Sequence, residues 1–203
     1  LSSFQKIESC LPNNTLKFNM ILIDNNSSDL TNKQISSIMK TDNRVLGYKN
    51  LKTYTAEKSS AYGLKLAYSL GADCLISLCS DLQDPPEIAC EMLYKLIEEG
   101  KIFDSVIACK TSTSGNRFVR FMRYLYYIIL KFSDRDSKII MGFHGFSCFY
   151  REICDDIFWY LENTNLNLRN SIMMASQKPK LFPYKQAKRE HGKSNYSLLG
   201  YFR

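Results

Sequence analysis

The stretch CLISLCSDLQDPPE, residues 74–87, contains the signals that decide the fold. Its first five residues form an apolar run with the length and composition of a buried strand. Two acidic residues, Asp81 and Asp84, follow where that strand ends. Pro85-Pro86 then predicts a helix over residues 87–99, because proline is favoured in the first turn of a helix. A buried strand, a polar loop and a helix in succession indicate one unit of an α/β domain.

Apolar runs and helical patterns alternate on both sides of this stretch. We predict strands at residues 18–23, 44–48, 74–78 and 105–108, and helices at 1–11, 31–40, 59–70 and 87–99. Gly71 follows the third helix as a C-terminal cap. The alternation predicts a parallel sheet with crossover helices. A helix is an unusual start for such a domain, so we expect a strand before it and treat the sequence as a fragment.

The alternation fades after residue 110. A polar loop at 111–116 precedes a predicted helix at 117–132, which has an apolar stripe and a neighbouring face with Arg117, Arg120 and Arg123. A segment punctuated by glycines and a helix at about 151–161 follow.

Composition narrows the classes of protein. The chain has 203 residues and a net charge of +7, and the excess lies wholly in residues 163–203, which carry eight basic residues and one acid. Such a segment predicts an anionic partner or a solvated basic face. No run approaches the roughly 18–20 apolar residues of a membrane-spanning helix. The seven cysteines form no CxxC pair, which favours a reducing compartment.

Polar residues gather where two of the predicted strands end. Asp24 to Asp29 follow the strand at 18–23, and Ser80 to Asp84 follow the strand at 74–78. Ligands of open parallel sheets bind beyond these carboxyl ends. Carboxylate and amide oxygens there predict a site for a hard cation, Mg²⁺ or Mn²⁺, of the kind that bridges a diphosphate. The alternative is a set of turn residues and helix caps.

Four segments resemble one known family. Residues 81–87 (DLQDPPE) match the signature of the family 2 glycosyltransferases that use polyprenyl-phosphate acceptors, which include dolichol-phosphate mannose synthase and the bacterial undecaprenyl-phosphate sugar transferases. Residues 23–31 (IDNNSSDLT) resemble VDDGSTDGT, and residues 142–151 resemble a region with GDFRLMDR. Residues 189–196 (REHGKSNY) resemble RxxGxSKY. In order and spacing, the resemblance covers nearly the whole chain.

The resemblance implies an α/β GT-A fold, with a mostly parallel sheet flanked by helices. It implies one catalytic domain over residues 1–203, with a nucleotide-binding half at about 1–110 and an acceptor-binding half at about 111–203. The implied ligands are a nucleoside-diphosphate sugar, a lipid-linked phosphate and a divalent cation. We expect the protein to act peripherally at the cytoplasmic face of a membrane.

The residues implied by the resemblance fall into four groups. They are Asp24, Asn25, Ser27, Asp29, Lys52 and Ser80 for the nucleotide; Asp81 and Gln83 for the metal; Asp81, Asp84 and His144 for catalysis; and Arg117, Arg169, Arg189, Lys193 and Ser194 for phosphate or acceptor.

Four positions depart from the family pattern. Cys79 replaces the first Asp of a DxD triplet, Asn25 replaces an Asp, and Asn195 replaces a Lys. Gly145 stands where many members have an Asp proposed as the catalytic base. A hydroxyl acceptor needs a base, whereas a phosphate monoester, with a second pKa of about 6, is already largely ionised at neutral pH. The Gly145 departure therefore favours a phosphate acceptor, and His144 is a candidate substitute base.

Two other functions remain open from sequence. The first is a saccharide-elongating glycosyltransferase with a hydroxyl acceptor, and the second is a non-catalytic relative that only binds nucleotide. We expect no nucleic-acid partner, because the aromatic residues near the basic segment show no base-stacking pattern. The sequence predicts no particular oligomeric state.

Overall fold

The computed structural model describes residues 16–111 and 140–187, together with Ser9, Phe121, Leu125 and Ile128. Strands and helices alternate along the first of these ranges. The elements are β1 (Met20–Asp24), α2 (Thr31–Thr41), β2 (Val45–Lys49), α3 (Ala56–Ser69), β3 (Cys74–Ser77), α4 (Pro86–Glu98), β4 (Ser105–Lys110), β5 (Ser147–Tyr150), a 3-10 turn η1 (Arg151–Ile153), α6 (Cys154–Asn163), α7 (Leu168–Ala175) and β6 (Pro179–Tyr184).

The strands form two sheets. β1 and β2 pair in parallel, in a register that places Met20 opposite Val45 and Asp24 opposite Lys49. The second sheet has the order β3-β5-β4-β6. In it β5 runs antiparallel to both of its neighbours, whereas β4 and β6 are parallel. β3, β4 and β6 therefore share one direction, and their carboxyl ends lie at one edge of the sheet together with the start of β5.

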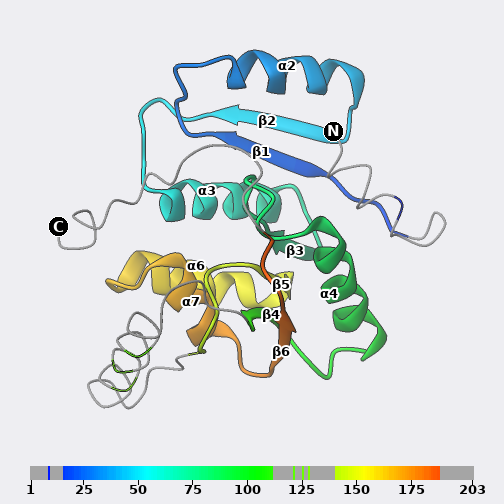
Figure 1. Ribbon diagram of the computed structural model, residues 1–203, viewed down its shortest axis with the longest axis vertical. Coiled ribbons are helices and arrows are strands. Elements are labelled where there is room, and N and C mark those ends of the chain that lie inside the picture. Colours follow the sequence, from blue (N-terminus) through cyan, green and yellow to red (C-terminus); the bar gives the residue numbers. More distant parts are fainter. Residues whose placement is uncertain are drawn as a thin grey trace.

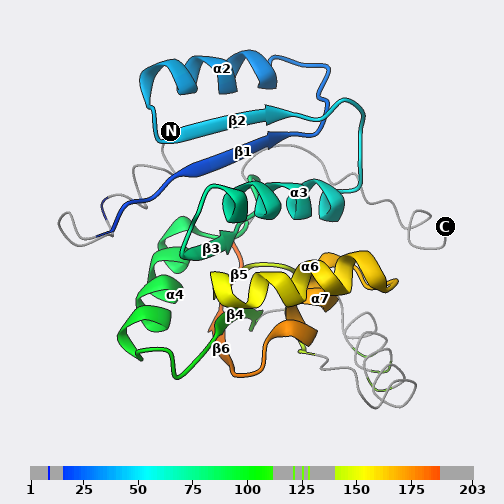
Figure 2. The ribbon, with the colours of Figure 1, turned by 180° about the vertical axis from the view of Figure 1, so that it is seen from behind.

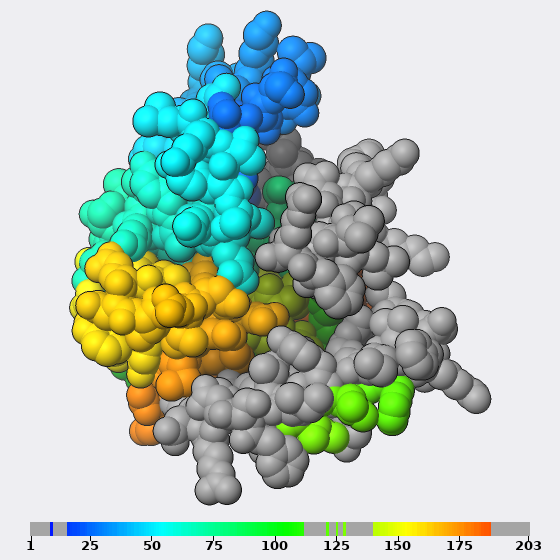
Figure 3. Space-filling model, turned by 90° about the vertical axis from the view of Figure 1, so that its left-hand side faces the viewer, coloured from blue at the N-terminus to red at the C-terminus, as the bar shows by residue number. Residues whose placement is uncertain are grey.

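Helices cover the faces of both sheets. α2 lies on one side of β1 and β2, and α3 lies on the other side (Figures 1 and 2). α3 also packs against β3 and α7, so it connects the two sheets. The space-filling view shows α6 and α7, in yellow and orange, directly below the cyan segments that follow β2 (Figure 3). The arrangement confirms an α/β fold with helix-flanked sheets, consistent with a GT-A fold.

The second sheet separates two apolar cores. Successive residues of β4 point to opposite faces of a strand, so Val106 packs with Met92 of α4 while Ile107 packs with Ile157 of α6 and Ile172 of α7. All five side chains are fully buried. This two-sided burial explains why β4 reads as a continuous apolar run rather than an alternating one.

Most of the predicted elements between residues 16 and 111 are confirmed. Helices 31–40, 59–70 and 87–99 and the four strands appear within three residues of their predicted bounds. Gly71 follows α3 with φ +82°, as expected of a cap. The predicted helices at 1–11 and 117–132 fall outside the described residues, apart from the four isolated positions given above. The sequence analysis missed α7, β5 and β6, and the antiparallel direction of β5 is a departure from the simple alternation.

Gly142 lies where the turn before β5 meets the end of β4. Its carbonyl oxygen accepts a hydrogen bond from Lys110 N at 3.1 Å. The residue has φ +82°, and a Cβ added there would lie 2.9 Å from the Lys110 carbonyl oxygen. A side chain at this position would therefore meet backbone atoms that cannot move without disturbing β4.

We expect Gly142→Ala to lower the free energy of unfolding by about 2–4 kcal/mol, the sum of left-handed backbone strain and a backbone clash. Gly71→Ala is the matched control, because Gly71 has the same φ of +82° and open space around its Cβ position. The control should cost only about 1–2 kcal/mol. Denaturant unfolding measures both, and equal losses would contradict the close packing at Gly142.

Candidate functional site

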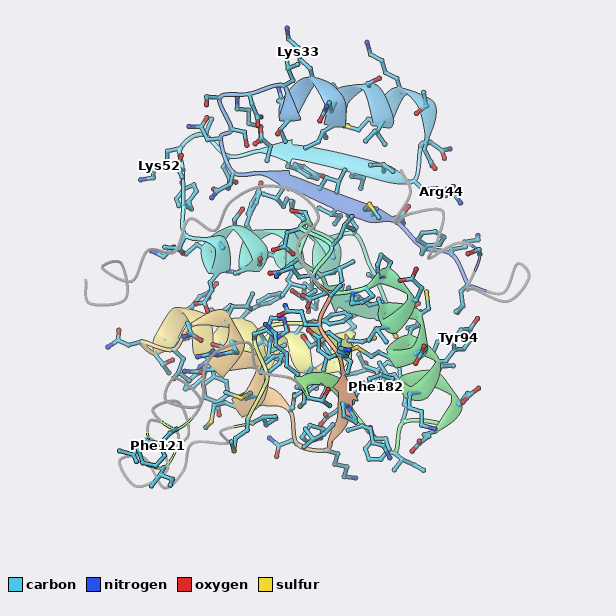
Figure 4. All side chains as sticks on the ribbon, in the orientation of Figure 1. Lys33, Arg44, Lys52, Tyr94, Phe121 and Phe182 are labelled. Carbon is cyan, nitrogen blue, oxygen red and sulfur yellow. The ribbon has the colours of Figure 1, made fainter. Side chains whose placement is uncertain are left out.

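Hydrogen bonds gather some of the predicted site residues into two clusters, both at carboxyl ends of strands. The first cluster joins the loop after β1 to the loop after β2. The second joins the loop after β3 to the turn before β5 and to the end of β6. Lys52 lies on the loop after β2, on the side of the molecule opposite Tyr94 and α4 (Figure 4).

Asp24 ends β1 with its side chain buried, only 2% exposed. Its Oδ1 accepts a hydrogen bond from Ser27 N at 2.9 Å. Its Oδ2 is enclosed and has no hydrogen-bond partner among the described residues. The turn between them has Asn26 at φ +61°, a left-handed conformation that asparagine tolerates. A buried acceptor without a partner costs about 1–3 kcal/mol, so Asp24 Oδ2 is a ready partner for a ligand donor.

Asn25 connects the two loops through both ends of its amide. Its Nδ2 donates to Tyr54 O at 2.7 Å, and its Oδ1 accepts from Tyr54 N at 3.0 Å. The same Oδ1 accepts from Asn50 Nδ2 at 2.9 Å, and that nitrogen also donates to Ser59 Oγ of α3. An aspartate could accept from Tyr54 N but could not donate to Tyr54 O. Asparagine at position 25 can therefore hydrogen-bond both backbone groups of Tyr54, which an aspartate could not.

Two other residues assigned to the nucleotide have local contacts in the structure. Asp29 Oδ1 accepts from Thr31 N at 2.9 Å at the start of α2. Hydrogen bonds from Thr31 lower the pKa of Asp29. Lys52 Nζ lies 5.4 Å from the centre of the Tyr54 ring. The turn-and-cap interpretation thus describes Asp29 in this structure, and its nucleotide role stays a prediction.

The loop after β3 carries the predicted metal ligands. Asp81 Oδ1 accepts from Gln83 N at 3.2 Å, and Leu82 between them has φ +58°. Partial enclosure, together with the carboxylates of Asp84 and Asp81, raises the pKa of Cys79 to about 11. The thiol is therefore protonated at neutral pH and is a poor ligand for a hard cation. Within the described ranges, no three His, Cys, Asp or Glu side chains are grouped so as to hold a metal.

Asp84 is the most enclosed acid of the site, at 1% exposure. Its Oδ1 accepts from the Tyr184 hydroxyl at 2.5 Å and lies 3.0 Å from His144 Nε2. The Tyr184 oxygen is also 3.2 Å from His144 Nε2. Gln186 Nε2 donates to the same Oδ1 at 3.5 Å, a long contact. The structure thus brings Asp84 and His144 together, as a shared role would require.

Charge and burial act in opposite directions on Asp84. Burial raises the pKa of Asp84. Hydrogen bonds from His144 and Tyr184 and the nearby charge of Lys110 lower it by more than burial raises it, so the pKa of Asp84 lies below its usual value. Burial and the Asp84 carboxylate raise the pKa of Tyr184. At neutral pH the cluster therefore contains an ionised Asp84 and a protonated Tyr184.

Gly145 allows the backbone conformation of the turn that carries His144. Its φ of +117° is a conformation that residues with a Cβ rarely adopt. Its carbonyl oxygen accepts from Ser147 Oγ at 3.2 Å, which ties the turn to the first residue of β5. The position that the sequence resemblance marks as a departure therefore has a backbone that favours glycine.

Several predicted phosphate-binding residues fall outside the described part of the chain, namely Arg117, Arg189, Lys193 and Ser194, together with the departure Asn195. Arg169 is described, at the start of α7. It lies near Glu57 of α3. Burial raises the pKa of Glu57, and the charge of Arg169 offsets only part of that rise. Ser80 lies exposed on the loop after β3.

Sequence reasoning missed several residues of these clusters, namely Asn50, Tyr54, Ser59, Lys110, Tyr184 and Gln186. Lys110 is the last residue of β4, so applying the strand-end rule to that strand as well would have found it. Asn50 directly follows β2 and could have been found in the same way. Tyr184 ends β6, a strand whose two prolines hid it from pattern analysis.

Comparison with known proteins identifies the class to which this site belongs. A model of glycosyl transferase family 2 matches residues 5–158, and the chain belongs to this family. It is therefore a glycosyltransferase by family, which implies a nucleotide-sugar donor and an acceptor. Members of the family typically depend on a divalent cation.

The chain is also similar to an uncharacterized glycosyltransferase, YkcC, from Bacillus subtilis strain 168. The two are 23% identical over 203 residues, which cover 97% of this chain and 58% of the relative. The chain thus spans somewhat under two thirds of the length of that protein. Neither match names a donor or an acceptor, so the narrower resemblance to enzymes that use polyprenyl phosphate stays a prediction.

We expect Asn25→Asp, which restores the residue of the family pattern, to lower the free energy of unfolding by about 0.5–1.5 kcal/mol. The carboxylate would face the Tyr54 carbonyl oxygen without a proton to donate. Asn163→Asp is a control, because Asn163 Nδ2 also donates to a carbonyl oxygen but at an exposed helix end. Chemical denaturation measures both variants. An Asn25→Asp protein as stable as the parent would show that the amide contacts to Tyr54 are dispensable.

Proposed function

We propose that this chain catalyses the inverting transfer of a sugar from a nucleoside-diphosphate sugar to a polyprenyl phosphate at the cytoplasmic face of a membrane. The acceptor would attack the anomeric carbon from the side opposite the departing diphosphate. The observation that supports this most is the placement of the DLQDPPE loop. It lies at the carboxyl end of β3, with Asp84 buried and ionised three residues after Asp81, at the edge where ligands of such sheets bind.

Asp81 and Gln83 are the residues that would hold a divalent cation. Mg²⁺ commonly binds through one or two carboxylates, with substrate phosphates and water completing its shell. One carboxylate and one amide, with Cys79 protonated, fit a cation held jointly with the diphosphate of the donor. When bound, such a cation neutralises charge that develops on the leaving group.

The remaining roles are distributed over both parts of the chain. Asp24, whose Oδ2 is enclosed without a described partner, would accept a hydrogen bond from the nucleotide. Arg189, Lys193 and Ser194 would contact the phosphates of the donor, and Arg169 and Arg117 would contact the phosphate of the acceptor. Arginine suits this task because its planar fork matches phosphate oxygens.

The basic residues also suit an anionic membrane surface, where each lysine or arginine near the lipid contributes about 1 kcal/mol. None of the helices in the described part of the chain is long and apolar enough to cross a bilayer. Because of these basic residues, we propose peripheral association through the segment at residues 163–203 and the arginines at 117–123.

A second candidate is transfer to a hydroxyl group of a saccharide. The contact between His144 Nε2 and Asp84 Oδ1 favours it, because a hydroxyl acceptor needs a base and a histidine oriented by a carboxylate can serve as one. Gly145 alone argued against this acceptor from sequence, and His144 supplies what Gly145 lacks.

We expect Asp81→Ala to abolish the Mn²⁺-dependent part of donor binding, because it removes the one carboxylate among the proposed ligands. Isothermal titration calorimetry of nucleotide sugars with and without Mn²⁺ measures this effect. Asp156→Ala is the control, since Asp156 is an exposed acid on α6. An Asp81→Ala protein that binds donor with the parental Mn²⁺ dependence would refute the metal assignment.

The acceptor can be decided by product analysis with the parent chain. Radiolabelled nucleotide sugars would be incubated with polyprenyl phosphate in detergent, or with oligosaccharide acceptors. We expect an organic-extractable glycosyl phosphate with the first acceptor. Elongated saccharide alone would instead establish the second candidate, and no transfer from any donor tried would contradict both.

A further inference from the structure

The second cluster has a proton arrangement that can be deduced by counting donors. Asp84 Oδ1, the Tyr184 hydroxyl and His144 Nε2 lie within 2.5–3.2 Å of one another. Asp84 Oδ1 accepts from the Tyr184 hydroxyl, which has one proton to donate. The shortest of the three contacts, Tyr184 to Asp84, takes that proton.

His144 Nε2 then faces two acceptors, Asp84 Oδ1 and the lone pairs of the Tyr184 oxygen. A nitrogen without a proton would repel both of them. Both contacts are favourable only when Nε2 carries the proton. In the neutral ring the other nitrogen, Nδ1, is therefore the one without a proton.

The surroundings hold the ring in this orientation. The rings of His144 and Tyr184 are stacked, with centres 6.2 Å apart and planes 19° from parallel. The Tyr184 ring in turn meets the edge of Phe146, which is buried, at 5.5 Å. In the described part of the chain, the other charged or titratable groups that act on the cluster are Lys110 on Asp84, and Cys79 and Cys109 on Tyr184, with Asp81 acting on Cys79.

His144 Nδ1 has no hydrogen-bond partner among the described residues, although protein atoms enclose it. An enclosed acceptor without a partner is costly, so a ligand that brings a donor to Nδ1 gains that energy. The acceptor oxygen has to displace some of the enclosing atoms when it binds. Nδ1 is thus suited to meet a polar hydrogen of the substrate.

We propose that Asp84 and Tyr184 fix His144 with its proton on Nε2, and that Nδ1 takes the proton of the attacking O–H group of the acceptor. The role in transfer rests on the proposed function, and within it on the second candidate, a hydroxyl acceptor. The acceptor oxygen forms a bond to the anomeric carbon, and the bond from that carbon to the diphosphate oxygen breaks. The bonding pair leaves with the nucleoside diphosphate, and the acceptor proton passes to Nδ1. Asp84 and Tyr184 are positioning residues in this step.

The proton position can be measured without any substrate. The chain has two histidines, His144 and His191, so His191→Gln leaves a single imidazole. Nitrogen-15 NMR distinguishes a protonated from a bare ring nitrogen. We expect the neutral ring of His144 to show the proton on Nε2 in the His191→Gln protein. A neutral ring with the proton on Nδ1 would overturn the inference, whatever the activity of the protein.

Variants in the His191→Gln background test whether Asp84 and Tyr184 determine which ring nitrogen of His144 carries the proton. Asp84→Ala frees the Tyr184 proton, which can then be donated to Nε2 over the 3.2 Å contact, so we expect the ring proton to move to Nδ1. Asp84→Ala with Tyr184→Phe removes both partners and should give a mixture of tautomers. Tyr150→Phe is the matched control, because it removes a tyrosine hydroxyl that donates to the Leu96 carbonyl oxygen outside the cluster. An unchanged tautomer in a folded Asp84→Ala protein would overturn the positioning role.

Activity measurements distinguish a hydroxyl acceptor from a phosphate acceptor as the source of the O–H group. With a hydroxyl acceptor, His144→Gln should lower kcat by about 10²–10⁴-fold. With a phosphate acceptor at pH 7 and above the loss should be small, because the monoester has already lost its second proton and leaves His144 no proton to accept. Parental activity of His144→Gln with every acceptor and at every pH would overturn the proton-acceptor role. A parent that transfers no sugar contradicts the proposed function and this role together, whereas an active parent with Nδ1–H contradicts this inference alone.

Discussion

The buried carboxylate of Asp84 is the constraint on which the second cluster depends. A carboxylate at 1% exposure is tolerated only when hydrogen bonds replace its lost water. Its partners His144 and Tyr184 come from the turn before β5 and the end of β6, so these hydrogen bonds join three segments when the loop after β3 that carries Asp84 is counted. The same hydrogen bonds that keep Asp84 ionised therefore also hold these three segments together. A substitution that removes one of these hydrogen bonds would therefore change both the packing of the segments and the pKa of Asp84.

Much of the fold follows from patterns within single segments. The buried strands β1, β3 and β4 are short apolar runs, and α3 and α4 have helical spacing with recognisable ends, so local sequence predicts them. β5 has only four residues, Ser147–Tyr150, and directly follows a turn with glycines at 142 and 145. β6 contains prolines at 179 and 183, which disfavour strand assignment. These two strands are specified by pairing with β4, a contact between residues distant in sequence.

Some residues of the candidate site can likewise be predicted from local sequence, and others cannot. The acids of the DLQDPPE segment and the residues after β1 were predicted from strand ends and from resemblance, and the structure places them there. Tyr184 and the exchange of hydrogen bonds between Asn25 and Tyr54 depend on tertiary contacts, which no local pattern contains. Asp29 instead makes a local contact with Thr31, which the turn-and-cap alternative had covered, whereas the burial that distinguishes Asp24 from it depends on tertiary packing.

The protonated thiol of Cys79 has a consequence for the order of events at the loop after β3. Without a second carboxylate, the protein alone offers a cation little attraction, while an anionic donor meets one charge less of repulsion. Under the proposed function, cation and donor would each raise the affinity of the other, and by thermodynamic reciprocity they would do so to the same extent. A loop of this kind would respond to the two ligands as a pair, and the supply of nucleotide sugar would govern how much metal the protein holds.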